Sequence, residues 1–290
     1  MKSIKAYTLD SFARSAGGGN PAGVVLNAEG LTEHEMQKIA GAVGFSETAF
    51  VMPSELADFR VRFFTPTEEV DLCGHATIGT FFLMAEKGLV QPGVYTQETK
   101  AGVLEVAVGE DHLILMDQTA PLFFRTLPKE EIAASLNIAV SDMPEDLPVQ
   151  MISTGMKDIM VPVKSIAILN GAKPDMDQIT EISRKYDAIG YHMFALETLH
   201  GGLAQCRNFA PLYGIPEESA TGTSNGALSS YIYHYGKITE EEARHIVIEQ
   251  GYSMGKPSEI FASLQFEGGE ITRVKVGGKA MNIAEMTVEY

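Results

Sequence analysis

An uncharged, largely apolar stretch that occurs twice constrains this sequence more than any other feature. The ten residues 76–85 (Ala-Thr-Ile-Gly-Thr-Phe-Phe-Leu-Met-Ala) carry no charge and form no wide polar face. A helix that is apolar nearly all round is a buried helix, and this one is too short to span a bilayer. Gly74 and His75 precede it, at an end where free backbone N–H groups attract anions. The sequence therefore predicts a helix enclosed within a domain, with an anion-binding start.

The same pattern returns in the second half of the chain. Residues 221–236 align with residues 73–88, so that Gly222 matches Gly74 at an offset of 222 − 74 = 148. Two further matches lie upstream at offsets of 145 and 146: residues 207–211 with 62–66, and residues 190–191 with 44–45. Three matches at nearly one offset, close to half of the 290 residues, indicate a duplicated unit. We therefore expect two equivalent buried helices that face one another across a domain interface.

Composition excludes several classes of partner. The net charge of −16 argues against nucleic acid and against anionic membrane surfaces, both of which need clustered Lys and Arg. No apolar run reaches membrane length, and the N-terminus runs directly into a strand pattern without a signal peptide. Two cysteines cannot build a disulfide framework, which fits a reducing compartment. We expect a cytoplasmic protein that contacts neither nucleic acid nor membrane.

The repeat also predicts the domain organisation. Prolines at 121 and 128 indicate the crossing between halves, so we expect one domain over residues 1–120 and another over residues 121–278. The final stretch, residues 279–290, has an extended pattern that allows its return to the first domain. Each half contains many strands, one peripheral helix and one enclosed helix. The expected fold is α+β, with two pseudo-symmetric domains, each a mostly antiparallel sheet curled or closed into a barrel around its buried helix.

Helix start and stop signals predict the peripheral helices. A capping box at Thr32 and Glu35 opens an apolar stripe that Gly44 ends. In the second half a similar stripe over residues 179–186 is expected to end at Gly190. A second capping box, residues 239–242, predicts a further helix through residue 247, stopped at residue 251.

Glu47 is the only ionisable group in residues 45–51, which have the aromatic and β-branched composition of a strand. Strand alternation would put Glu47 on the same face as Phe45, Ala49 and Val51, where a solvent-facing Glu is out of place. One interpretation is a glutamate at a strand edge or rim. The other is a partly buried carboxylate suited to carrying protons. The pattern alone leaves both open.

Other chemistry-bearing groups give weaker signals. Asn20 lies in a glycine-rich segment that composition favours as a hairpin loop, although such a backbone can also approach a ligand closely. Cys73 and His75 provide two potential metal ligands where zinc needs three or four, so no metal is expected. His234, on the second enclosed helix, is expected to be a core histidine. No nucleotide-binding motif is present, and no cofactor is expected.

Four segments together resemble a known family. Residues 19–24 (Gly-Asn-Pro-Ala-Gly-Val), residues 45–50 (Phe-Ser-Glu-Thr-Ala-Phe), the Gly74-His75 pair and residues 220–226 (Ala-Thr-Gly-Thr-Ser-Asn-Gly) are similar, in the same order, to segments of the PhzF-like isomerases of phenazine-biosynthesis type. The resemblance covers essentially the whole chain. It implies the fold of diaminopimelate epimerase and proline racemase, in which two pseudo-equivalent domains place the active site in the cleft between them.

The resemblance also implies the chemistry. It implies a cofactor-independent isomerase, expected to be a homodimer, that moves a proton between carbons of a small carboxylated substrate. Glu47 matches the family's acid/base, and His75 matches a site histidine. Glu218 supplies a carboxylate where the family motif Asp-Pro-Ala-Thr-Gly becomes Glu-Ser-Ala-Thr-Gly, a departure that affects the choice of substrate more than the reaction class. The substrate-binding residues implied are Asn20, Cys73, Gly74, Thr221, Gly222 and Thr223.

Two alternatives remain at this stage. Cys73 stands at a helix start where diaminopimelate epimerase has a catalytic cysteine, so a Cys73-based epimerase or dehydratase of an amino or imino acid is possible. Its counterpart here is Thr221, which is a poor base at neutral pH, and we therefore favour Glu47. The remaining alternative is a non-catalytic binder of a small carboxylate, which keeps the fold without turnover.

Overall fold

The computed structural model describes residues 2–290 and divides them into two compact units. The first unit comprises Met1–Asp117 and Gly277–Tyr290, and the second comprises Gln118–Val276. The boundary expected after residue 120 lies a few residues beyond this division. No helix within residues 2–290 combines the length and the apolar character needed to cross a membrane.

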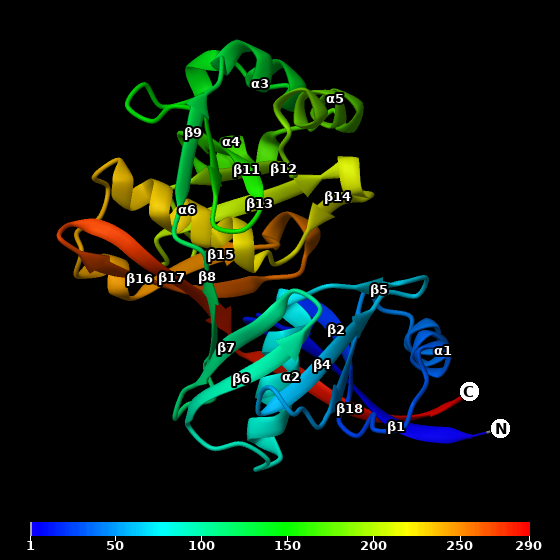
Figure 1. Cartoon of the computed structure of the whole chain (residues 1–290). Helices are drawn as coiled ribbons and strands as arrows, with labels where there is room; N and C mark the ends of the chain where they lie inside the picture. The colour runs from blue at the N-terminus through cyan, green and yellow to red at the C-terminus, as the bar shows by residue number, and fades with distance from the viewer. Residues whose placement is uncertain (1) are drawn as a thin grey trace. The chain divides into compact units, whose positions relative to one another are not determined.

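Within residues 2–290, nine strands and two helices belong to the first unit (Figure 1). The strands are β1 (Ser3–Ser11), β2 (Asn20–Val25), β3 (Thr48–Met52), β4 (Phe59–Phe64), β5 (Glu69–Val70), β6 (Gly93–Thr99), β7 (Gly102–Val108), β8 (Ile114–Gln118) and β18 (Ala280–Glu289). The helices are α1 (Glu33–Val43) and α2 (Gly74–Glu86). The C-terminal strand β18 pairs antiparallel with β1, and the amide of Lys2 donates to the carbonyl of Tyr290 at 3.2 Å. The two ends of the chain therefore lie side by side in this unit.

The second unit contains the remaining elements. Its strands are β9 (Leu122–Thr126), β10 (Gln150–Ser153), β11 (Lys157–Val163), β12 (Gly190–Ala195), β13 (Ala204–Ala210), β14 (Ile215–Glu218), β15 (Ile246–Gln250), β16 (Ser258–Glu267) and β17 (Glu270–Gly278). Its helices are α3 (Lys129–Leu136), α4 (Ile166–Gly171), α5 (Met176–Tyr186) and α6 (Gly222–His234). Short 3-10 turns lie at Val140–Asp142, Pro211–Tyr213, Glu242–Arg244 and Tyr252–Met254.

Strand pairing follows the same plan in both units. β2 runs parallel to β3 as β11 runs parallel to β12. β3 is antiparallel to β4 as β12 is to β13, and β4 is parallel to β6 as β13 is to β15. The hairpins β6–β7 and β15–β16 also correspond. This shared topology supports the duplication expected from the sequence, and the α+β fold with a sheet around a central helix is confirmed.

The enclosed helices α2 and α6 are the matched elements of the repeat. Each spans 13 residues, and in α2 every residue from 76 to 85 is buried. Because Gly79 has no side chain, α2 packs directly on β1: a Cβ there would lie 2.5 Å from Leu9 Cδ1 and 2.8 Å from Ser11 Oγ. Burial on all sides explains why these stretches lack a polar face.

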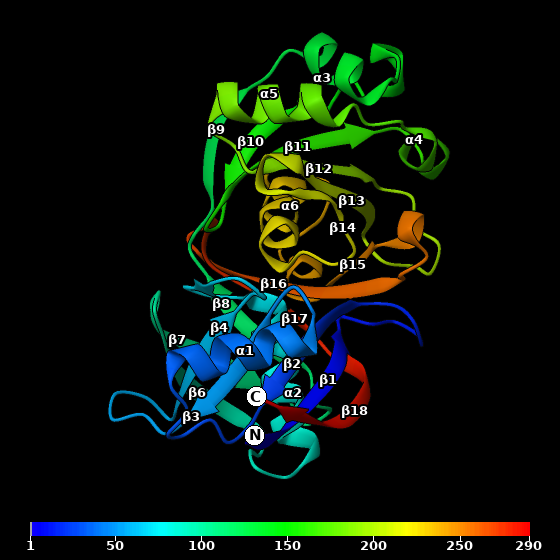
Figure 2. The same ribbon diagram turned by 90° about the vertical axis from the view of Figure 1, so that its right-hand side faces the viewer.

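The peripheral helices follow their capping signals. Thr32 and Glu35 form the expected capping box of α1, and Gly44 ends the helix with a left-handed φ of 78°. Figure 2 shows α1 lying across one face of the first unit's strands, where Met36 and Ile39 are buried in an apolar cluster. In the second unit α5 ends at Asp187, whose backbone is also left-handed. Gly190 begins β12, so the helix ends three residues before the predicted stop (190 − 187 = 3).

The helix predicted for residues 239–247 is wrong. The capping bonds between Thr239 and Glu242 form, but the helical turn extends only over Glu242–Arg244. Ile246–Gln250 is then strand β15, paired with β13 and β16. The run Ile-Val-Ile favours a strand, and sheet neighbours on both sides outweigh the local helix signal.

Candidate functional site

Glu47, Cys73 and His75 come together in the first unit. Glu47 Oε2 lies 3.3 Å from His75 Nε2, and Cys73 Sγ lies 3.4 Å from His75 Nδ1. The Glu47 and His75 side chains keep 22% and 10% of their surface exposed, so solvent still reaches this cluster. Glu47 Oε2 is itself buried, and among residues 2–290 it has no hydrogen-bond partner with acceptable geometry. The three side chains form one compact group with a carboxylate, an imidazole and a thiol.

The start of α2 positions two members of this cluster. Cys73 is the N-cap residue, with an extended backbone (φ −136°, ψ 114°), and it makes no side-chain capping bond. His75 follows in the first turn, and its backbone carbonyl accepts a hydrogen bond from Ser11 Oγ at 2.7 Å. The close approach at Gly79 brings Ser11 this near. The first strand thus fixes the depth and rotation of the helix end that carries His75.

The prediction that Glu47 lies inside a strand is wrong, but the expected alternation of its neighbours is partly seen. Strand β3 begins at Thr48, one residue later, and both Phe45 and Glu47 are half-buried while Ser46 is exposed. The Glu47 carbonyl nevertheless accepts from the Gly23 amide at 3.0 Å, which ties its backbone to β2. The Glu47 backbone therefore lies at the edge of the sheet, just before β3, while its side-chain carboxylate is partly buried. The two interpretations left open by the sequence each describe one part of the residue.

Asn20 and Gly74 are connected to this cluster, Asn20 through strand pairing and Gly74 through the start of α2. Asn20 begins β2 opposite Ser11, the residue that bonds the His75 carbonyl, and it is buried. Gly74 is the first residue of α2, and a Cβ there would meet nothing within 4 Å. The space beside the Gly74 Cα is therefore open.

The remaining predicted residues lie in the second unit, at the start of α6. Thr221 Oγ1 donates to Glu218 Oε2 at 2.6 Å, which joins the predicted carboxylate to the N-cap residue. Gln250 Nε2 donates to the Glu218 carbonyl at 2.8 Å, and its Oε1 accepts from the Thr221 amide at 3.2 Å. Gly222 is the first residue of α6, and the carbonyl of Thr223 accepts from Thr154 Oγ1 at 3.1 Å.

A buried chain of hydrogen bonds leads away from this helix start. Asn225 Nδ2 donates to Gln250 Oε1 at 2.7 Å, and Asn225 Oδ1 lies 3.1 Å from His192 Nε2. Asn208 Nδ2 lies 3.1 Å from both His192 Nδ1 and Ser224 Oγ. Because an amide nitrogen can only donate, His192 Nδ1 accepts and Nε2 carries the proton. Burial lowers the pKa of His192 to about 4, so the ring is neutral at pH 7.

Asp158 ends this chain in the interior. Its Oδ2 accepts from Ser224 Oγ at 2.6 Å, while Oδ1 has no hydrogen-bond partner in the described part of the chain. Burial raises the pKa of the Asp158 carboxyl to about 7, and the Ser224 hydroxyl only partly opposes that increase. The folded state therefore holds a proton on Asp158 more tightly than the unfolded chain does.

We expect Asp158→Asn to reduce the loss of stability with rising pH. The stabilisation from the Asp158 proton is complete below about pH 4 and is lost as pH rises through about 7, which amounts to about 3 kcal/mol between pH 5 and pH 8. The asparagine side chain cannot titrate, so the variant should not lose this part of its unfolding free energy. Relative to wild type, the variant should therefore become more stable as pH rises from 5 to 8. Urea unfolding at several pH values measures it, and a constant difference would contradict the assignment.

The sequence alone did not reveal this buried chain of hydrogen bonds. Asn225 lies in a segment that carries the family resemblance, but the sequence predicts no role for it or for Gln250. Asp158 precedes the apolar run of β11, and His192 lies inside β12. Their partners are 66 and 33 residues away, so no local pattern links them.

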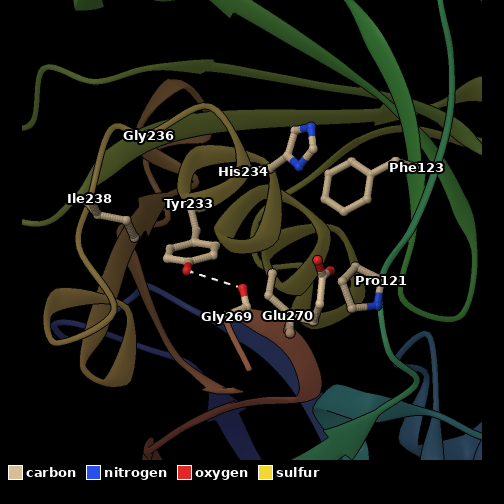
Figure 3. Close-up of a pocket in the computed structure, with 9 residues that line it drawn as sticks. Pro121, Phe123, Tyr233, His234, Gly236, Ile238, Gly269 and Glu270 are labelled. Carbon is tan, nitrogen blue, oxygen red and sulfur yellow. Dashed lines mark hydrogen bonds between the residues drawn. The ribbon is translucent and has the colours of Figure 1, made fainter. Parts of the chain in front are cut away.

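A pocket of about 490 Å³ lies at the other end of α6. Figure 3 shows the His234 and Phe123 rings side by side, with a ring-centroid distance of 4.3 Å, and Tyr233 directed to the Gly269 carbonyl. His234 is exposed, so its prediction as a core histidine is wrong: the helix emerges from its enclosure at its last turn. None of the predicted site residues lines this pocket.

Comparison with known proteins identifies the family. The family model for phenazine biosynthesis-like proteins, PhzC-PhzF, matches residues 9–286. An uncharacterized isomerase of Bacillus subtilis (strain 168), YfhB, is 37% identical over 288 residues, which cover 97% of each chain. A trans-2,3-dihydro-3-hydroxyanthranilate isomerase of Pseudomonas chlororaphis is 29% identical over 293 residues, again 97% of each chain.

Solved structures agree. The phenazine biosynthesis protein of the PhzF family from Bacillus anthracis superposes with a TM-score of 0.89 at 36% identity, and each chain is covered completely. A hydroxyproline epimerase from Agrobacterium vitis superposes with a TM-score of 0.61 at 12% identity, covering 100% of this chain and 92% of the other, which shows a shared fold. The expected resemblance, the epimerase-like fold and the enzyme class of a PhzF-like isomerase are thus confirmed. By sequence over nearly its whole length and by structure, the chain belongs to the PhzC-PhzF family of phenazine biosynthesis-like proteins.

Proposed function

We propose that this protein is a cofactor-independent isomerase that moves a proton between two carbons of a small carboxylated substrate, with Glu47 as the acid/base. The observation that carries this proposal is the contact between the partly buried Glu47 carboxylate and His75 at the start of α2. A carboxylate in such a position can remove a proton from carbon and, as the carboxylic acid, return it to another carbon. The substrate gains and loses one proton, so no other reactant is needed.

The neighbouring groups suit this step. His75 Nε2 lies 3.3 Å from Glu47 Oε2, within reach to orient the carboxylate. The first amides of α2 offer hydrogen-bond donors to a substrate carboxylate or to the enolate that forms when the proton leaves. In the second unit, Glu218, Thr221, Gly222 and Thr223 remain the predicted contributors from the equivalent helix start.

The substrate class is proposed from the helix starts and from one relative. An anion-binding helix end favours a carboxylated compound. The Pseudomonas chlororaphis relative is named for trans-2,3-dihydro-3-hydroxyanthranilate, which carries a carboxylate. Because Glu218 and Ser219 replace the usual Asp-Pro, the natural substrate can differ from that compound.

The test is an isotope-exchange screen in deuterated water. The protein is incubated with trans-2,3-dihydro-3-hydroxyanthranilate and with a panel of small amino and hydroxy acids, and incorporation of deuterium at carbon is followed by NMR. Exchange that requires the protein supports the proposal. Tight binding of a carboxylate without exchange in any compound would instead favour the non-catalytic binder.

A cysteine-based mechanism is the second candidate, because Cys73 Sγ lies 3.4 Å from His75 Nδ1. We expect Cys73→Ala to lower kcat no more than about tenfold, since in our proposal the thiol lines the site without carrying the proton; that is less than removal of an acid/base costs. Initial rates with the best substrate from the screen measure this. A loss of about a thousandfold in Cys73→Ala would transfer the acid/base role to Cys73.

A further inference from the structure

The cluster of Glu47, Cys73 and His75 contains the ligand types that zinc prefers. Thiolate sulfur, imidazole nitrogen and carboxylate oxygen are its usual protein ligands. One ligand atom from each of these residues lies within 4.8 Å of the other two. The sequence offered only the Cys73 and His75 pair, and folding adds Glu47 as a third ligand from a segment 26 residues earlier (73 − 47 = 26).

Two of the three distances between these atoms are near those of a tetrahedral zinc site. With zinc–sulfur bonds of about 2.3 Å and zinc–nitrogen or zinc–oxygen bonds of about 2.1 Å, tetrahedral angles separate sulfur from nitrogen by about 3.6 Å and nitrogen from oxygen by about 3.4 Å. Here Cys73 Sγ lies 3.9 Å from His75 Nε2, and His75 Nε2 lies 3.3 Å from Glu47 Oε2. The sulfur also lies 3.4 Å from His75 Nδ1 and within 4.8 Å of a Glu47 carboxylate oxygen, so binding of one ion by all three residues requires the thiol to turn toward His75 Nε2.

The surroundings leave a place for the ion. Glu47 Oε2 is buried without an aligned hydrogen bond, so a cation would satisfy an acceptor that the fold leaves unsatisfied. Cys73 is buried, which shields the thiol, while the partial exposure of Glu47 provides a route of entry. Three protein ligands leave the fourth position of zinc open to water.

We propose that Glu47, Cys73 and His75 form a binding site for Zn²⁺, and that an ion bound there blocks proton transfer. The ion would hold the Glu47 carboxylate through Oε2 and neutralise its charge, so Glu47 could no longer take a proton from carbon. Binding of the ion is independent of the proposed function, whereas the block rests on it.

Zinc binding is tested on the full-length protein after removal of metal with EDTA. The wild type competes with a chromophoric chelator for one Zn²⁺ per chain. Cys73→Ser and His75→Asn each weaken binding at least tenfold. The matched controls Cys206→Ser and His34→Asn, which alter a buried cysteine in the second unit and an exposed histidine, leave it unchanged. Circular dichroism verifies that each variant is folded.

Cobalt provides a direct signature of the thiolate ligand. Co²⁺ added to the wild type should produce the ultraviolet sulfur-to-metal charge-transfer band, and Cys73→Ser should lack it while Cys206→Ser retains it. Failure of the wild type to bind stoichiometric Zn²⁺, or equal binding by wild type, Cys73→Ser and His75→Asn, would overturn the site.

The inhibitory role is measured separately. Zn²⁺ at one equivalent should reduce deuterium exchange of an accepted substrate at least tenfold, with competition between ion and substrate, and EDTA should restore the rate. Full activity of the zinc-loaded enzyme would refute the block. If no compound in the panel exchanges, yet one Zn²⁺ binds through Cys73, the proposed function fails and the zinc site stands.

Discussion

Glu47→Gln is expected to lower the rate of substrate deuterium exchange and kcat by about a thousandfold, the magnitude typical for loss of a general acid/base. Glutamine keeps the size and shape of the side chain but cannot accept a proton from carbon. Because His75 Nε2 lies 3.3 Å from Glu47 Oε2, the amide can still contact the imidazole, so the site should retain its structure. Substrate affinity, measured by calorimetry, should change much less than kcat.

Glu55→Gln is the matched control for this prediction. Glu55 lies in the same unit on an exposed loop, and its substitution removes the same negative charge. We expect normal exchange in Glu55→Gln and unchanged melting temperatures in both variants. A Glu47→Gln enzyme with exchange within tenfold of wild type would exclude Glu47 as the acid/base and leave Cys73 or Glu218 to be tested next.

The second large effect is expected on stability, from Arg207→Met. Arg207 donates from Nε and Nη2 to the two carboxylate oxygens of Glu217, both at 2.9 Å. Its Nη1 also donates to the carbonyls of Leu169 and Ala172 at 3.1 and 3.2 Å. Methionine fills a similar volume but leaves Glu217 without its cation and two carbonyls without a donor. Breaking a buried ion pair from one side costs about 3 kcal/mol or more, and we expect that loss in the free energy of unfolding.

The repeat supplies its own control, Arg62→Met. Arg62 holds Glu69 through Nε at 2.6 Å, as the matching Arg207 holds Glu217, and each arginine also lies over the ring two residues later. Glu69 keeps a second cation, Lys100, at 3.1 Å, and no backbone carbonyl is bonded to Arg62 in the described residues. Because Glu69 retains Lys100, we expect Arg62→Met to cost clearly less free energy of unfolding than Arg207→Met. Urea unfolding of both variants measures the difference, and equal losses would contradict the assigned role of the two carbonyls.

Much of the architecture followed from local pattern. The all-round apolar stretches predicted α2 and α6, and the capping box with Gly44 predicted α1 and its end. The equal spacing of three matches predicted the duplication. The helix predictions are correct because a helix must bury its apolar surface and pair the free N–H and C=O groups at its ends. Both requirements can be read within a dozen residues.

Where the pattern misled, long-range pairing was the cause. The signals at 239–242 were those of a helix, yet β13 and β16 hold residues 246–250 as a strand. Glu47 was expected inside a strand that actually begins one residue later. His234 was expected inside the core, but α6 emerges from its enclosure there. Each of these three outcomes depends on how far a strand or an enclosing sheet extends, which residues distant in the sequence determine.

The sequence by itself determined which residue types were available for chemistry: a lone carboxylate in an aromatic segment, and a cysteine and a histidine at the start of a buried helix. Only the tertiary structure decided that Glu47 reaches His75, that Cys73 completes a three-residue group, and that Asp158 accepts a hydrogen bond from Ser224 in the first turn of α6. The physical reason is that these contacts join side chains from separate strands and helices. Their distances are fixed by sheet register and by close packing such as that at Gly79, which no local sequence pattern specifies.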